Sequence, residues 1–127
     1  YKYLLKHTAE ISKNIKADKF VFYSDSITKE DLWDEAIFRK KLQYGSDLGT
    51  RMENAFTELF QLNYEKVLII GSDLLDLDKN LIEYAFHQLK YHDVVIGPSK
   101  DGGYYLMGLK MIHEQIFKKK VFYIYFK

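Results

Sequence analysis

Val67-Leu68-Ile69-Ile70 is an unbroken run of leucine and β-branched residues, and it is followed at once by Gly71-Ser72-Asp73. No polar residue alternates with the apolar ones, so a strand at this place would be buried on both of its faces. Strands of that kind are typical of parallel sheets that carry helices on both sides. The run therefore predicts an α/β fold.

The chain on either side of this strand alternates helical and β-rich patterns. Apolar residues at helical spacing predict helices from the start of the chain to Ile15, over 52–60, over 78–89 and, in a short form, over 111–117. Further strands are predicted at 20–23, 41–44, 94–97, 104–109 and 121–126, and the one at 104–109 is expected to run antiparallel to its neighbour. The pattern at 33–38 is ambiguous, and a short helix there is a guess. Such alternation indicates right-handed βαβ units. We expect residues 1–127 to form a single domain, a three-layer α/β/α sandwich with a mostly parallel sheet.

Composition narrows the classes of function. The formal net charge is only +1 and no long block of Lys or Arg is present, so nucleic acid is not an expected partner. The absence of cysteine excludes disulfides, thiolate metal sites and cysteine nucleophiles. No apolar stretch approaches the roughly 20 residues of a membrane-spanning helix, and the first residues lack the layout of a signal peptide. We expect a cytoplasmic protein without a membrane partner.

Three carboxylates, Asp73, Asp76 and Asp78, follow the buried strand directly. Ligands of open α/β sheets bind outside the carboxyl ends of the strands. Aspartate oxygens suit Mg²⁺ or Mn²⁺, which also take phosphate oxygens from a substrate. Asp78 precedes a helix and fits an N-cap better than a ligand. For Asp76 a turn-shaping role is equally consistent, whereas Asp73, the first carboxylate after the strand, is the favoured functional residue.

The segment 97–105 contains Asp101-Gly102-Gly103 ahead of a predicted strand. Taken alone, it is best explained as a hairpin turn. Paired glycines also let the backbone approach a ligand closely. A position of Asp101 near Asp73, produced by adjacent strand ends, would favour that second interpretation.

The segment 43–52 places Asp47 at a predicted N-cap and Arg51 in the first turn of the helix. A helix N-terminus favours anions, so Arg51 could clamp a phosphate or a sugar hydroxyl. A capped helix with an Asp47–Arg51 pair at i,i+4 spacing explains the segment better when it is taken alone.

Together, the motifs Asp-Leu-Gly-x-Arg-Met at 47–52, Gly-Ser-Asp-x-x-Asp-Leu at 71–77 and Gly-Pro-x-x-Asp-Gly-Gly-Tyr-Tyr-Leu-x-Gly-Leu at 97–109 resemble a bacterial family of glycosyltransferases. That family is DUF2064, whose members are often labelled arsenosugar-biosynthesis or radical-SAM/selenodomain-associated transferases. The resemblance runs from about Ala17 to Phe117. It implies a GT-A-like nucleotide-diphospho-sugar transferase fold.

The resemblance also implies roles for individual residues. Asp73 and Asp101 would be catalytic, with Asp73 holding a divalent metal on the nucleotide diphosphate and Asp101 acting as a second acidic ligand or substrate contact. The implied metal ligands, for Mg²⁺ or Mn²⁺, are Asp73, Asp76 and Asp101. The implied substrate-binding residues are Asp47, Arg51, Gly102, Gly103 and Tyr104, of which Asp47 and Arg51 would line the acceptor side.

The sequence departs from the family pattern in three places. Relatives usually carry Cys-Pro or a similar pair where Leu74-Leu75 stand, and their Trp-Ser-Thr segment after the last helix is not seen. The family also begins with a strand and a Lys/Pro/Gly-rich phosphate loop, and this chain starts after that element. We therefore expect an N-terminally incomplete domain with poor activity of its own. The strand at 121–126, or a strand from a second copy in a homo-oligomer, would fill the central sheet position left vacant.

Three functions follow as hypotheses. The first is a metal-dependent glycosyltransferase that uses a nucleoside-diphosphate sugar. The second is a nucleotidyltransferase of the molybdenum-cofactor or phospholactate type, which would take a nucleotide as its partner. The third is a non-catalytic remnant that acts as a binding or assembly module, so the sequence leaves open whether the chain is an enzyme.

Overall fold

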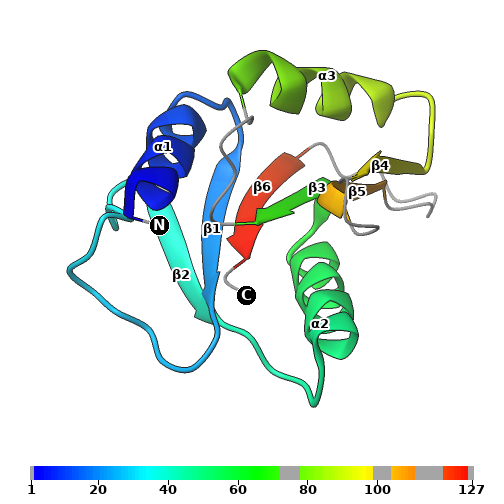
Figure 1. Cartoon of the computed structure of the whole chain (residues 1–127). Coiled ribbons are helices and arrows are strands. Elements are labelled where there is room, and N and C mark those ends of the chain that lie inside the picture. Colours follow the sequence, from blue (N-terminus) through cyan, green and yellow to red (C-terminus); the bar gives the residue numbers. More distant parts are fainter. Residues whose placement is uncertain (1, 72–77, 99–103, 111–118, 126–127) are drawn as a thin grey trace.

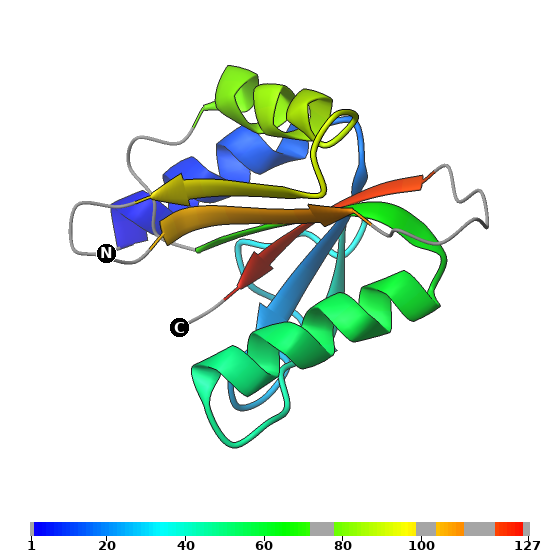
Figure 2. The same cartoon turned by 90° about the vertical axis from the view of Figure 1, so that its right-hand side faces the viewer.

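A computed structural model of the chain describes residues 2–71, 78–98, 104–110 and 119–125. These residues form a six-stranded sheet with helices on both faces (Figure 1). The elements in chain order are α1 (Lys2–Lys13), β1 (Asp18–Tyr23), β2 (Phe38–Leu42), α2 (Leu48–Gln61), β3 (Tyr64–Gly71), α3 (Lys79–Gln88), β4 (Val94–Pro98), β5 (Tyr104–Lys110) and β6 (Lys119–Tyr125). In Figure 2 the helices α1 and α3 lie above the sheet and α2 lies below it. The predicted three-layer α/β/α sandwich is confirmed.

The strand order across the sheet is β2-β1-β6-β3-β5-β4. Only β5 runs against the others, antiparallel to both β3 and β4, as predicted for this segment. The last strand, β6, lies in the middle, parallel to both β1 and β3 (Figure 1). The hypothesis that the terminal strand takes the central position is thereby confirmed. An uncharged run such as Val121–Ile124, which is opposite Val67–Ile70, suits a strand with neighbours on both edges.

The central strand β3 contributes to both cores, as its unbroken apolar run predicts. Leu68 and Ile70 belong to the core beneath α1 and α3, whereas Val67 and Ile69 belong to the core beneath α2. All four side chains are almost fully buried. Their alternation follows from the two-residue period of a strand, which sends successive side chains to opposite faces.

Two element boundaries near β2 differ from the sequence prediction. The short helix guessed at 33–38 is wrong: Trp33 is buried against the ring of Phe38, and one turn closes through Asp34 before β2 begins. The strand predicted at 41–44 lies earlier, at Phe38–Leu42. It begins earlier because the Phe38 side chain, 1% exposed, anchors the start of β2 in the core.

The starts of two helices agree with the sequence prediction. The carboxylate of Asp47 accepts a hydrogen bond from the Thr50 amide at 2.7 Å and caps α2. This amide bond holds the pKa of Asp47 below its ordinary value. The carboxylate of Asp78 accepts one from the Leu81 amide at 2.7 Å and caps α3, which confirms the N-cap interpretation of Asp78. The short helix predicted at 111–117 lies outside the described residues.

Candidate functional site

The candidate site lies at the edge of the sheet where the parallel strands end. β1 ends there at Tyr23, β2 at Leu42 and β3 at Gly71, and β4 ends there at Pro98 because it runs in the same direction. The N-terminus of α2 follows the end of β2 and so begins near this edge. Open α/β sheets bind their ligands at this edge, which we call the carboxyl edge.

Two aspartate-bearing loops start from this edge. Leu106 of β5 is opposite Ile70 on one side and Gly97 on the other, so β3 and β4 end on either side of the same residue. With about 4.8 Å between neighbouring strands, the ends of β3 and β4 lie about 10 Å apart. The sheet therefore brings the attachment points of loops 72–77 and 99–103 together.

The residues of these loops are themselves outside the described part of the chain. This applies to Asp73, Asp76, Asp101, Gly102 and Gly103. The backbone of Tyr104 is described, since it opens β5 opposite Pro98.

Arg51 ties three elements together at the carboxyl edge. Its Nε donates to the carbonyl oxygen of Gly45 at 3.0 Å, and its Nη1 donates to the carbonyl oxygen of Ser24 at 3.1 Å. Ser24 follows β1, Gly45 follows β2 and Arg51 itself belongs to α2. The guanidinium thus binds backbone carbonyls and not the Asp47 carboxylate that the i,i+4 spacing suggested. The planar fork of an arginine suits two such acceptors.

Two amide side chains reinforce this edge. Gln43, 5% exposed, donates through Nε2 to the carbonyl oxygen of Phe22 at 2.9 Å. Asn54 donates through Nδ2 to the carbonyl oxygen of Tyr44 at 2.9 Å. The turn between β2 and α2 needs a glycine at Gly45, because its φ of +137° is a conformation that residues with a Cβ rarely adopt. No local pattern points to Asn54, because its partner is ten residues away in a loop.

The loop that follows β1 is held by a partly buried ion pair. Nζ of Lys40 lies 2.9 Å from a carboxylate oxygen of Asp31 and 2.7 Å from the carbonyl oxygen of Thr28. The hydroxyl of Tyr23 donates to the other carboxylate oxygen of Asp31. Burial, and then this hydrogen bond to Asp31, raise the pKa of Tyr23. The network holds the loop against the ends of β1 and β2.

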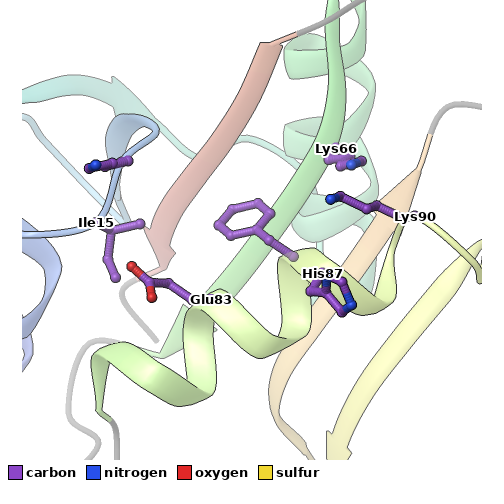
Figure 3. A pocket seen from close by; sticks show the side chains of 7 residues that line it. Ile15, Lys66, Glu83, His87 and Lys90 are labelled. Carbon is purple, nitrogen blue, oxygen red and sulfur yellow. The ribbon is translucent and has the colours of Figure 1, made fainter.

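A pocket of about 250 Å³ lies at the opposite edge, beside α3 (Figure 3). Its lining includes Lys16, Lys66, Glu83, His87 and Lys90. Lys16 follows the end of α1, and His87 and Lys90 lie at the end of α3. Cations there offset the negative ends of the two helix dipoles, which disfavour an anionic ligand. This explains Lys16 and Lys90 without a substrate.

Two kinds of feature are absent from the described residues. Across residues 2–71, 78–98, 104–110 and 119–125, no three His, Cys, Asp or Glu side chains are grouped so that they could hold a metal ion. The candidate ligands Asp73, Asp76 and Asp101 are not among these residues. None of the described helices is long and apolar enough to cross a lipid bilayer.

A family model described as "Uncharacterized protein conserved in bacteria (DUF2064)" matches residues 7–122. The chain belongs to the DUF2064 family. This DUF2064 protein is also similar to a crystal structure from Desulfovibrio desulfuricans G20 that is provisionally assigned as a nucleotide-diphospho-sugar transferase. The identity is 22% and the TM-score 0.71, with 98% of this chain and 68% of that chain covered. The similarity shows that the DUF2064 protein has the fold of that transferase, as the sequence resemblance implied. No curated protein matches the chain at a significant level.

Proposed function

We propose that this DUF2064 protein transfers a glycosyl group from a nucleoside-diphosphate sugar, with a divalent cation bound to the diphosphate. The observation that supports this most is the topology of the sheet. It brings the ends of β3 and β4 to one edge, about 10 Å apart, and each is followed by a loop that contains aspartate. The provisional assignment of the Desulfovibrio structure as a nucleotide-diphospho-sugar transferase agrees with it.

The proposed cation ligands are Asp73, Asp76 and Asp101, and the cation is Mg²⁺ or Mn²⁺. Carboxylate oxygens are the donors that these hard cations prefer, and the cations leave positions open for phosphate oxygens. When bound, the cation would neutralise the charge that develops on the leaving diphosphate. The short distance between the strand ends allows carboxylates from both loops to share one cation.

The backbone and side chains of the edge would orient the substrate. Gly102 and Gly103 have no Cβ, so their backbone can approach the donor closely, with Tyr104 beside them. On the acceptor side we propose Asp47 and Arg51. A guanidinium has five N–H donors, and the bonds to Gly45 and Ser24 leave others for a sugar hydroxyl or a phosphate. Arg51 would then position the loops and contact the substrate at the same time.

Calorimetric titration with UDP-glucose, with GTP and with each in the presence of Mn²⁺ tests the proposal. We expect UDP-glucose to bind only with Mn²⁺, and Asp73→Asn and Asp101→Asn each to weaken binding at least tenfold. Asp93→Asn is the matched control, because Asp93 immediately precedes β4 at the opposite edge. Failure of every nucleotide to bind would contradict the proposal and favour a non-catalytic module.

The released product distinguishes the two kinds of transferase. Glycosyl transfer breaks the bond between the sugar and the diphosphate and releases a nucleoside diphosphate. Nucleotidyl transfer from a triphosphate releases pyrophosphate. Release of pyrophosphate from GTP, without release of UDP from UDP-glucose, would contradict the glycosyltransferase hypothesis and support the nucleotidyltransferase hypothesis.

A further inference from the structure

The two outer strands of the described sheet differ in charge. β2 carries Arg39, Lys40 and Lys41 in a row, whereas the start of β4 is the uncharged run Val94-Val95-Ile96. Charged side chains on an edge strand prevent it from pairing with another chain. The β2 edge therefore has a common protection against pairing that the β4 edge lacks.

The hydrogen-bond pattern shows which backbone groups of β4 point outward. The Lys110 amide donates to the carbonyl oxygen of Asp93 at 3.1 Å, so this opposed pair is hydrogen-bonded. In an antiparallel ladder hydrogen-bonded pairs alternate along the strand, and Val95 opposite Gly108 is the next of them. The N–H and C=O groups of Val94 and Ile96 consequently point away from β5.

The same two residues have exposed side chains. Val94 is 49% exposed and Ile96 is 50% exposed. They are opposite Leu109 and Met107 of β5, which pack against the core beneath α2, so all four lie on that face of the sheet. Leu109 and Met107 also line an apolar groove of about 370 Å³ beside α2. The outer edge of β4 thus adjoins an apolar groove.

We propose that β4 pairs with β4 of a second copy of this chain, antiparallel, across a two-fold axis at Val95. Val94 then lies opposite the partner's Ile96, and Ile96 lies opposite the partner's Val94. Each of these two pairs exchanges two backbone hydrogen bonds, which gives four in total. A second copy fits because the short run supplies a β-branched residue at both outward positions, so it is complementary to itself. The irregular register between Gly97 and Pro98 limits the pairing to this run.

The proposed dimer is weak and does not depend on the proposed function. Pairing of three residues buries far less than the roughly 1,200 Å² of a stable interface, so we expect dissociation constants in the micromolar to millimolar range. The axis lies at β4, and the two carboxyl edges therefore face opposite ends of the dimer.

Sedimentation velocity over a concentration series tests the proposal. The wild-type chain should shift from monomer to dimer, and Ile96→Lys should raise the dissociation constant at least tenfold. The matched control is Leu42→Lys, which adds a charge to a 42% exposed leucine on the other edge strand. Circular dichroism verifies that each variant is folded. A wild-type chain that stays monomeric at millimolar concentration, or equal effects of both variants, would overturn the proposal.

Disulfide cross-linking tests the register, since the chain has no cysteine of its own. Residues of a hydrogen-bonded pair have Cα atoms about 5.5 Å apart, a distance that a disulfide can span. A mixture of Val94→Cys and Ile96→Cys chains should therefore cross-link at least fivefold faster than either variant alone. Equal rates in the mixture and in the separate variants would refute the register.

Discussion

Replacement of Arg51 by methionine should loosen the carboxyl edge measurably. The substitution keeps most of the apolar stem but removes the donors to Gly45 and Ser24, at 3.0 and 3.1 Å. Hydrogen bonds from a charged group contribute about 1.5–3 kcal/mol each. The two carbonyls are partly solvated and regain water, so we take the lower value for both and expect a loss of about 3 kcal/mol. Arg51→Lys keeps the charge without the planar fork and should lose about half of this.

Urea unfolding at 25 °C, followed by circular dichroism, measures the loss. With an m-value of about 1.5 kcal/mol/M, the midpoint for Arg51→Met should fall by about 2 M. Arg39→Met is the control, because the exposed Arg39 donates one hydrogen bond, to the Tyr64 hydroxyl at 3.3 Å, beside a cation–π contact with the Phe20 ring. We expect Arg51→Met to be the least stable, then Arg51→Lys, then Arg39→Met. Equal midpoints for the two methionine variants would refute the bracing role of Arg51.

Two further predictions concern pH and packing. Burial, and then a hydrogen bond to Asp18 at 2.6 Å, raise the pKa of Tyr64 to about 12 from its ordinary value of 10.0. Between these pH values the native state keeps a proton that the unfolded chain releases, so this contribution to stability is full below pH 10 and is lost toward pH 12. In urea unfolding, Tyr64→Phe should therefore lose less stability than the wild-type chain over that range. An equal loss in both proteins would contradict the assignment. A Cβ on Gly108 would lie 2.9 Å from Leu68 Cδ1 and 3.1 Å from Leu89 Cδ1, so Gly108→Ala should cost about 1–3 kcal/mol. A Leu89→Ala background removes the 3.1 Å contact but not the one with Leu68, so part of that cost should disappear there, whereas strict additivity in the double-mutant cycle would argue against the overlap.

The sequence predicts those parts of the fold that depend on local pattern. The apolar run Val67–Ile70 identified β3 because burial on both faces removes polar alternation. Asp47 and Asp78 identified two helix starts because an N-cap bonds an amide only three residues away. The sequence left two candidates for the central strand, the strand at 121–126 of the same chain or a strand from a second copy. An apolar strand indicates a central place in a sheet, but it does not show whether that sheet belongs to its own chain or to another copy.

Contacts between distant segments could not be predicted in the same way. The sequence suggested that Arg51 pairs with Asp47, four residues away, but its guanidinium binds the carbonyl of Ser24, 27 residues away. That partner depends on how β1 is placed beside β2, which local spacing does not determine. The start of β2 was missed for a related reason, because the burial of Phe38 against Trp33 depends on the path of the preceding loop.

Whether the loops after β3 and β4 share one cation can be measured by paramagnetic broadening of amide signals with Mn²⁺ and UDP-glucose. The broadening falls with the sixth power of distance, and β3 is about 23 Å long from Tyr64 to Gly71. We predict that the signals of Gly71 and Gly97 disappear while those of Tyr64 and Lys110 persist, and that Asp73→Asn and Asp101→Asn each restore the lost signals. Broadening centred on Tyr64 and Lys110, or broadening at Gly71 that survives Asp101→Asn, would show that the two loops do not hold a common cation.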